Sequence, residues 1–408
     1  MSQTSEQTRG ALQQAGQNRF RHLTDADLKT PAFVYDEGAL RTNAIRLAWL
    51  CQEAGCSLLY ALKPLSMVPV LKVLRQNVAG FSASSLYEAM AARKVIGRQG
   101  SVHITTPGLR PNEIDRVAAT CDYITFNSLP QWEALGHRAV QDAKCGLRVN
   151  PHLSLVEDDR YNPCRRHSKL GVHIGALCAE ASSRPEILSS LTGLHFHTNC
   201  DCADTRPLLN TVNHIATQLP HILDKLEWIN LGGGYLLPVR ADLGPFNEAV
   251  NLLTDKWGVQ VFFEPGAAVV RQACCLVASV IDIFDSDGWP VAVLDTSVNH
   301  MPEVFEYQFT PDVYGTTAGG SHAYLLAGST CLAGDVFGRH AFRKPLEIGS
   351  RVVFPGMGAY TSVKWHCFNG VSLPDVYAWT EQDELVHKHT FTYADYTARY
   401  GGPPDATS

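Results

Sequence analysis

The chain has 408 residues, of which 45% are hydrophobic and 18% are charged, and its formal net charge is −6. This composition is typical of a globular protein with one large core or two linked ones, and the mild acidity argues against nucleic-acid binding. No apolar run is long enough to cross a bilayer, and the first thirty residues lack the apolar centre of a secretory signal. We therefore expect a cytoplasmic protein whose residues 1–30 are disordered or loosely attached.

Short segments rich in β-branched or aromatic residues recur between residues 58 and 264 and are mostly separated by helical patterns. The predicted strands are Leu58–Lys63, Ala79–Ser84, Ser101–Thr106, Tyr123–Asn127, Gly146–Asn150, Gly193–Asn199, Glu227–Gly232 and Val259–Glu264. The helical patterns include Leu86–Ile96, Pro111–Ala119, Pro130–Val140 and Thr205–Leu219. This alternation predicts an α/β fold with a (β/α)8 TIM-like barrel, whose chemistry lies at the C-terminal ends of the strands.

After residue 270 the sequence changes to β-rich segments broken by Gly and Pro, which predict a C-terminal β domain. These segments are Leu276–Phe284, Pro290–Asp295, Ala323–Ala327 and Arg351–Phe354. The extended run Pro31–Tyr35 is expected to join this domain, because N-terminal strands are often tied down in this way. The barrel is therefore assigned to 45–270 and the β domain to 31–44 plus 271–408. The long stretch Pro151–Ser190 is a candidate substrate loop.

Lys63 closes the first predicted strand and is followed at once by Pro64. An amine at this end of a buried strand is placed to form an imine, provided that burial or a cationic neighbour lowers its pKa. The ordinary alternative is a surface lysine just past a strand. Other polar groups predicted at the same end of the barrel favour the chemical role.

Glu264 and a glycine run also lie at predicted strand ends. The run Gly232-Gly233-Gly234 would let backbone N–H groups approach a phosphate, although a triple glycine is equally common in tight turns. A buried Glu264 needs a cationic partner. One candidate partner is a protonated pyridine nitrogen of a cofactor ring, which the carboxylate would keep as an electron sink. The other is Arg148, through a salt bridge. The two are not mutually exclusive.

His195 and His197 alternate along one predicted strand and so share a face. His197 is nearer the strand end and could lie flat on a cofactor ring, while His195 is interpreted as structural. Metal ligation lacks a third ligand, and the twelve scattered cysteines have no paired zinc spacing, so we expect no metal site.

Several motifs, in order, resemble the fold-type III pyridoxal-phosphate (PLP) decarboxylases over residues 31 to about 395. They are Tyr60-Ala61-Leu62-Lys63, Phe196-His197, Gly232-Gly233-Gly234, Glu264-Pro265-Gly266, Cys331–Asp335 and Gly358–Thr361. Within that group the chain most resembles the carboxynorspermidine/carboxyspermidine decarboxylases. The segments that carry this closer resemblance are Ser84–Glu88, Leu147–Pro151, Ser168–Gly171, Cys331–Asp335 and Phe368–Gly370. The resemblance implies a barrel of the alanine racemase/ornithine decarboxylase type, PLP as cofactor, and polyamine biosynthesis as the pathway.

The resemblance also implies roles for single residues. Lys63 would form the imine with PLP, His197 would stack on its ring and Glu264 would pair with its pyridine nitrogen. The residues assigned to cofactor binding are Lys63, Arg148, His197, Gly233, Gly234, Glu264 and Tyr360. No nucleic-acid or membrane partner is implied.

In the implied homodimer the active site is shared between subunits. Cys331 would enter from the partner subunit as the proton donor that follows loss of carbon dioxide. Asp335, from the same loop, would bind the distal amine of the substrate. Acidic residues that could bind further cationic nitrogens are Asp201, Glu303 and Glu306.

Departures from the family pattern keep other substrates open. Ala267 stands where ornithine and diaminopimelate decarboxylases carry an arginine and where carboxynorspermidine decarboxylases usually carry an acid, and Lys169 replaces a usual arginine. Decarboxylation of another basic or diamino acid in a specialised pathway is therefore an alternative. Glu264 argues against a racemase, which typically carries an arginine there. Retention of Lys63 and Cys331 argues against a non-catalytic PLP-binding regulator.

Overall fold

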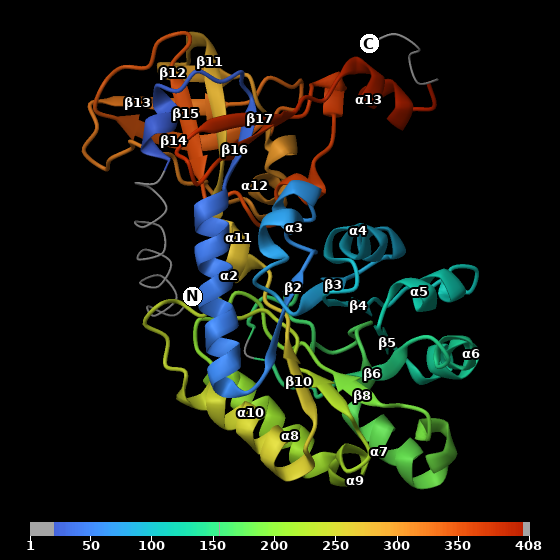
Figure 1. Cartoon of the computed structure of the whole chain (residues 1–408). Coiled ribbons are helices and arrows are strands. Elements are labelled where there is room, and N and C mark those ends of the chain that lie inside the picture. The colour runs from blue at the N-terminus through green and yellow to red at the C-terminus, as the bar shows by residue number, and fades with distance from the viewer. Residues whose placement is uncertain (1–19, 155, 403–408) are drawn as a thin grey trace. The chain divides into compact units, whose positions relative to one another are not determined.

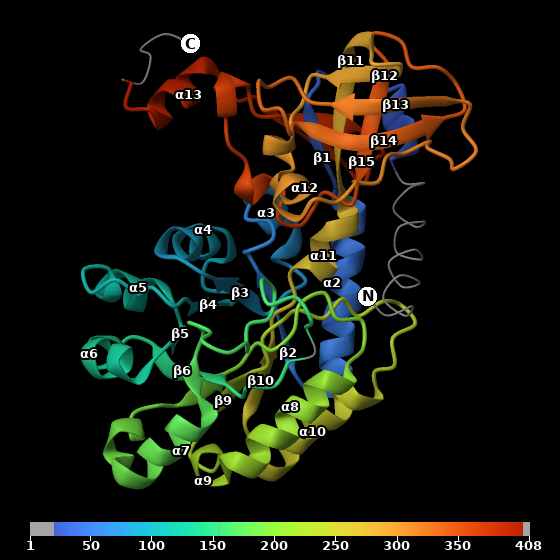
Figure 2. The same cartoon turned by 180° about the vertical axis from the view of Figure 1, so that it is seen from behind.

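The computed structural model describes residues 20–154 and 156–402. The chain divides into two compact units, Arg41–Val269 on one side and Met1–Leu40 with Val270–Ser408 on the other. Their helices and strands are labelled in Figure 1 and seen from behind in Figure 2. Each unit is described by itself below.

Eight parallel strands form a closed barrel in the first unit, which confirms the predicted fold class. Each strand pairs with the next along the chain and the last pairs with the first, through Phe262 and Phe263 opposite Ser57 and Leu58. The strands are β2 (Ser57–Ala61), β3 (Gly80–Ala83), β4 (Ser101–Thr105), β5 (Tyr123–Phe126), β6 (Lys144–Asn150), β8 (Gly193–His195), β9 (Trp228–Asn230) and β10 (Gln260–Phe263).

Helices surround the barrel on the outside (Figures 1 and 2). In α4 the hydroxyl of Ser85 caps the first turn by accepting from the N–H of Glu88, and Ala89, Ala92 and Val95 are buried at helical spacing. The helices of this part of the chain are α2 (Glu37–Ala54), α3 (Val68–Leu74), α4 (Leu86–Ile96), α5 (Ile114–Thr120), α6 (Leu129–Ala139), α7 (Ile174–Ser183), α8 (Arg206–Gln218), α9 (Pro220–Leu223), α10 (Gly244–Trp257) and α11 (Ala267–Val270).

Trp228 is a large, fully buried side chain of the barrel, and its indole packs over glycines of two other strands. Gly146, Gly193 and Trp228 lie side by side on β6, β8 and β9. A Cβ added at Gly193 would lie 2.0 Å from the indole, so only glycine leaves room for the ring. Because side chains alternate along a strand, the residues two positions further on face the same way as this layer.

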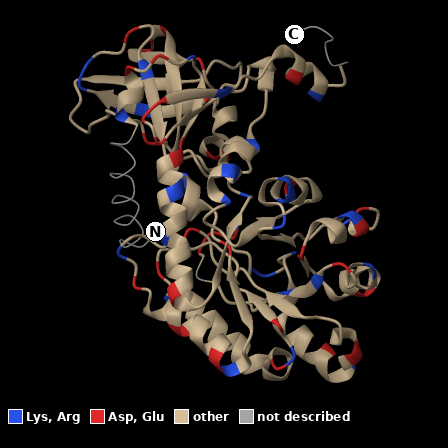
Figure 3. Ribbon diagram, viewed as in Figure 1, with Lys and Arg blue, Asp and Glu red and all other residues tan. Residues whose placement is uncertain are grey.

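Charged residues lie on the helices outside the barrel strands (Figure 3), and some of their side chains pair across neighbouring elements. Arg138 of α6 lies 2.6 Å from Asp115 of α5, and Lys144 of β6 lies 2.7 Å from Glu227 before β9. Such exposed pairs stabilise little because solvent screens them. The barrel is therefore held mainly by its apolar core.

The long stretch Pro151–Ser190, expected to be a substrate loop, contains further regular structure. The short strand β7 (Val172–His173) pairs with β6 and is followed by α7 and by a 3₁₀ turn at Pro185–Leu188. Residue 155 lies outside the described part of the chain. Among the described residues of this stretch, most of those outside helix and strand therefore lie before β7.

A mostly antiparallel sheet forms the second unit. Its order is β14-β13-β12-β11-β1-β16-β17, and β15 pairs with β11. The strands are β1 (Ala32–Asp36), β11 (Cys274–Ser286), β12 (Trp289–Leu294), β13 (His322–Ala327), β14 (Val336–Phe342), β15 (Arg351–Pro355), β16 (Asp375–Trp379) and β17 (Leu385–His389). The N-terminal strand β1 pairs antiparallel with β11 and parallel with β16, so it lies within this sheet. The helices α12 (Pro302–Tyr307) and α13 (Tyr393–Arg399) complete the unit.

The expectation of a loosely attached segment over residues 1–30 is wrong for its last part. Phe20, Leu23 and Leu28 are buried in the apolar core of the β unit, together with Val277 and Val353. Burial of these three side chains holds residues 20–30 against the sheet. Residues 1–19 lie outside the described part of the chain.

None of the helices in the described ranges is both long enough and apolar enough to cross a membrane.

Candidate active site

Three polar side chains form a layer across β6, β8 and β9. Arg148 lies opposite His195, and His195 lies opposite Asn230. All three are buried, and each follows the layer of Gly146, Gly193 and Trp228 by two residues, so all three share its face. The strand register therefore brings together a guanidinium, an imidazole and an amide from distant parts of the sequence.

Glu264 follows β10 and contacts this layer. Its Oε1 lies 3.0 Å from Nε2 of His195, and its Oε2 accepts from Nδ2 of Asn230 at 2.8 Å. Burial alone would raise the pKa of Glu264, but His195 and the hydrogen bonds from Ser82 and Asn230 hold it well below the usual range. Glu264 is thus a buried anion at neutral pH.

The alternative salt bridge between Glu264 and Arg148 does not appear among the ion pairs of the described residues, where His195 is the partner within 4 Å. Burial lowers the pKa of Arg148 to about 10, and the charge of Glu264 opposes that effect. Arg148 therefore remains a cation and acts on Glu264 through its charge at longer range. Glu264 instead contacts His195 and Asn230. His195 was interpreted as structural, and Asn230 was not predicted from the sequence to be a site residue.

His197 has its ring orientation fixed by the glycine turn that follows β9. The backbone N–H of Gly233 donates to Nδ1 of His197 at 3.1 Å, so the neutral ring carries its proton on Nε2. Burial, followed by the charges of Lys63 and Arg148, holds the pKa of His197 well below its usual value. His197 is therefore neutral at physiological pH.

The glycine turn is shaped by the protein's own backbone. Gly234 has a φ of 89°, and a Cβ there would lie 2.0 Å from the carbonyl oxygen of Asn199. The N–H of Gly232 donates to Oδ1 of Asn230 at 2.8 Å, and that of Gly233 is used by His197. Among residues 20–154 and 156–402, no acceptor contacts the N–H of Gly234. Of the three glycines, Gly234 thus has the N–H best placed to serve a phosphate oxygen.

Lys63 follows β2 at the same end of the barrel. Solvent reaches its side chain, yet the surrounding protein lowers the pKa of the amine by desolvation. The charge of Arg148 lowers it further, while Cys200, Glu264 and Glu88 oppose the shift. A lowered pKa increases the fraction of the amine that is neutral and therefore nucleophilic. Glu88 has no predicted role beside Lys63, although its spacing from Ser85 is typical of a helix cap and can be recognised in the sequence.

Asp335, in the β unit, is buried and already satisfied by hydrogen bonds. Its Oδ2 accepts from Oγ of Ser297 at 2.9 Å and from the N–H and hydroxyl of Thr330, and its Oδ1 accepts from the N–H of Val298 at 2.8 Å. These contacts do not support the predicted contact with a substrate amine. They tie the loop before β14 to the segment after β12.

Cys331 is exposed on that same loop. Its N–H donates to Oδ1 of Asn369 at 2.9 Å, and Asn369 has a positive φ of 56°. The loop is therefore held at both ends, by Asp335 within it and by Asn369 from the segment before β16. This arrangement leaves the thiol accessible.

The remaining predicted residues lie in both units. Glu303 and Glu306 share Lys364 at 3.5 Å and 2.5 Å, so each already has a cationic partner. Tyr360 is half-buried with a φ of 59°. Asp201 is exposed in the barrel unit, four residues after His197. The structure thus brings together Lys63, Arg148, His197, Gly233, Gly234 and Glu264 within the barrel unit.

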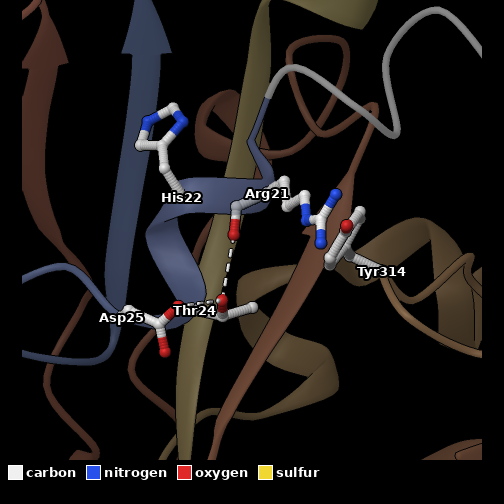
Figure 4. A pocket seen from close by; sticks show the side chains of 5 residues that line it. All are labelled: Arg21, His22, Thr24, Asp25 and Tyr314. Carbon is white, nitrogen blue, oxygen red and sulfur yellow. Dashed lines mark hydrogen bonds between the residues drawn. The ribbon is translucent and has the colours of Figure 1, made fainter. Parts of the chain in front are cut away.

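A surface hollow of about 530 Å³ lies in the β unit (Figure 4). It is lined by Arg21, His22, Thr24, Asp25 and Tyr314. None of these residues belongs to the candidate site.

Comparison with known proteins gives matches over most of the chain. Residues 43–271 match the family model for the pyridoxal-dependent decarboxylase, pyridoxal binding domain. The chain is 36% identical over 391 residues to a carboxyaminopropylagmatine decarboxylase of Synechocystis sp., covering 92% of this chain and 96% of that protein. It is 33% identical over 388 residues to a carboxynorspermidine/carboxyspermidine decarboxylase of Campylobacter jejuni, covering 91% and 98%.

Solved structures agree with these matches. The crystal structure of carboxynorspermidine decarboxylase from Campylobacter jejuni, complexed with norspermidine, has a TM-score of 0.81 and 32% identity and covers 91% of this chain and 100% of that one. A diaminopimelate decarboxylase from Helicobacter pylori has a TM-score of 0.78 at 17% identity and shares the fold.

Proposed function

Because the chain belongs to the pyridoxal-dependent decarboxylases, we propose that it decarboxylates a carboxylated polyamine. The observation that carries the reaction type is the buried carboxylate of Glu264, kept ionised by His195, Asn230 and Ser82 at the strand ends that also hold Lys63. Decarboxylation needs an electron sink, and an anion beside a protonated pyridine nitrogen maintains one.

The residues present fit PLP. Glu264 supplies the anion for a ring nitrogen, His197 supplies a neutral ring of fixed orientation, and Gly234 supplies an N–H for a phosphate oxygen. When bound, PLP supplies the electron-withdrawing system that weakens the bond to the substrate carboxylate. We assign Arg148 and Tyr360 to the same cofactor, as groups that attract or hydrogen-bond its phosphate.

Each residue then has a defined task. Lys63 would hold the cofactor covalently, because its lowered pKa makes the amine available for such a bond. Glu264 would accept a hydrogen bond from the ring N–H, and His197 would pack against the ring. The exposed thiol of Cys331 delivers a proton to the substrate carbon after carbon dioxide leaves.

The substrate class follows from the relatives. Two relatives that match over more than nine-tenths of this chain act, by name, on carboxylated polyamine-like molecules, and the related solved structure holds norspermidine. All these compounds carry cationic nitrogens, which need acidic partners. We assign that task to Asp201 and, with Lys364 displaced, to Glu303. Such a reaction belongs to polyamine biosynthesis.

We further propose a homodimer in which Cys331 serves the partner subunit's barrel. Asp335 would then be a positioning residue, because its hydrogen bonds shape the loop that presents the thiol. Residues 45–270 would act as the cofactor-binding domain, and residues 31–44 plus 271–408 as the domain that completes the site. A cytoplasmic location is proposed too, since all twelve cysteines are described and free, which suits a reducing compartment.

Carbon dioxide release from a panel of substrates tests the proposal. The panel comprises carboxynorspermidine, carboxyspermidine and carboxyaminopropylagmatine, with diaminopimelate, ornithine and lysine as short controls. We expect kcat/KM for at least one carboxylated polyamine to exceed that of every control by a hundredfold or more, roughly 2.7 kcal/mol of transition-state binding. Faster turnover of a short diamino acid would overturn the substrate class and leave the reaction type intact.

A further inference from the structure

His195 has one hydrogen-bonded ring nitrogen and one that is buried without a partner. Nε2 lies 3.0 Å from Oε1 of Glu264. Nδ1 is inaccessible to solvent and, within the described ranges, meets no hydrogen-bond donor or acceptor. The side chain is 1% exposed, so water cannot serve the free nitrogen from the surface.

This asymmetry fixes the protonation state of the ring. A carboxylate can only accept, so the proton of neutral His195 lies on Nε2. A second proton, on Nδ1, would leave a buried N–H unpaired, which is costly. Burial lowers the pKa of His195, although the charge and hydrogen bond of Glu264 oppose that shift. The pair is therefore a neutral imidazole and an anionic carboxylate.

Asn230 holds the other oxygen of the same carboxylate. It donates to Oε2 of Glu264 at 2.8 Å and accepts from Gly232 at 2.8 Å. His195 and Asn230 together leave the carboxylate little freedom to rotate. Because the histidine stays neutral, it orients the anion without cancelling its charge.

We propose that His195 is a positioning residue that keeps Glu264 ionised and aimed, so that the carboxylate holds the pyridine nitrogen of PLP in its protonated form. This inference rests on the proposed pairing of Glu264 with that nitrogen. It gives a chemical task to a histidine that the sequence indicates only as structural. The expected effect of its loss is a less protonated ring and slower decarboxylation.

His103 is a matched control within the same barrel. It is buried like His195, its Nε2 lies 2.9 Å from Oγ of Ser101, and its ring stacks on Tyr123 with centroids 4.2 Å apart. The charge of Glu264 raises the pKa of His103, against the larger effect of burial, but His103 makes no hydrogen bond to Glu264 in the described contacts. Loss of His103 therefore removes a buried imidazole from the barrel and leaves the carboxylate contacts intact.

The test uses the holoenzyme loaded with PLP that carries ¹⁵N in its ring. The variants are His195→Phe, which removes the donor, His195→Gln, whose amide can replace the Nε2–H, and His103→Phe. Glu264→Gln serves as the reference for loss of the anion. The ¹⁵N chemical shift reports ring protonation independently of turnover, and kcat is measured in parallel. Should His195→Phe fail to fold, His195→Asn replaces it, because its amide is one carbon too short to reach Glu264.

We expect His195→Phe to move the ¹⁵N signal toward that of unprotonated pyridine and to lower kcat by about tenfold or more. His195→Gln should restore most of the wild-type ¹⁵N shift and most of kcat. His103→Phe should have the wild-type ¹⁵N shift and the wild-type kcat. A wild-type ¹⁵N shift in His195→Phe, with a displaced shift in Glu264→Gln, would show that His195 only packs. An unchanged shift in Glu264→Gln would overturn the pairing of Glu264 and this inference together.

Discussion

Gly233 donates its backbone N–H to Nδ1 of His197 across 3.1 Å, so the turn after β9 sets the orientation of a ring that lies two residues after the end of β8. The neighbouring N–H of Gly232 is likewise taken, by Asn230, which itself contacts Glu264. The glycine turn is thus connected to both groups proposed to contact the cofactor ring. A shift of this turn would disturb the two contacts together.

Loss of the anion at Glu264 should slow the chemistry more than it weakens substrate binding. Glu264→Gln keeps the shape of the side chain but removes the charge that stabilises a protonated ring nitrogen. We expect kcat to fall at least tenfold, roughly 1.4 kcal/mol of transition-state stabilisation, with KM little changed. Steady-state kinetics at full cofactor occupancy provide the measurement. Unchanged turnover would make Glu264 a structural residue.

Acid should destabilise the fold through buried neutral histidines. Burial lowers the pKa of His103 to about 3, whereas the same group has an ordinary value of 6.5 in the unfolded chain. Between these values the unfolded state binds a proton that the native state does not, so the free energy of unfolding falls as pH drops below 6.5. The contribution approaches about 1.4 kcal/mol per pH unit.

Urea unfolding at pH 7 and pH 5 measures this linkage. His103→Phe should lose less stability between the two pH values than the wild type does. His137→Phe, at an exposed position on α6, serves as the comparison. An equal loss in wild type and His103→Phe would mean that His103 does not remain neutral in the native state.

Asp335→Asn should impair every substrate alike. The amide cannot accept from Ser297, Val298 and Thr330 at once, so the loop that carries Cys331 should loosen. We expect a lower kcat and a loss of about 1–3 kcal/mol in the free energy of unfolding. KM should rise equally for substrates with and without a distal amine. A selective rise for substrates that carry the amine would restore the direct contact predicted from the sequence.

Subunit mixing tests the shared site. Lys63→Ala and Cys331→Ala homodimers should each be nearly inactive, because one lacks the imine-forming amine and the other the proton donor. Exchange between them gives about half heterodimers, each with one intact site, so about a quarter of wild-type activity should return. Native mass spectrometry verifies the exchange. No recovery after verified exchange would mean that each chain builds its own site or that Cys331 lies outside it.

Much of the barrel was predictable from local pattern. Helix α4 begins and ends at the predicted residues, Leu86 and Ile96, because a serine cap precedes a regular apolar face and Gly97 ends it. Polar residues at strand ends, such as Lys63 and Glu264, were also visible, since parallel strands expose their carboxyl ends on one side of the barrel.

Partnerships across strands were not predictable in this way. That Glu264 contacts His195 and Asn230, and not Arg148, depends on register and side-chain reach, which no local pattern encodes. The burial of Asp335 depends on Ser297, a residue far from it in sequence. The packing of Phe20 depends on the distant strands β11 and β15.

Reductive trapping at Lys63 tests the central claim most directly. Borohydride treatment of the purified yellow holoenzyme should add one pyridoxyl group, identified by peptide mass spectrometry on Lys63, and should abolish carbon dioxide release. Lys63→Ala should show neither the adduct nor the activity. An active wild-type enzyme whose Lys63 peptide carries no adduct after borohydride treatment would contradict the account.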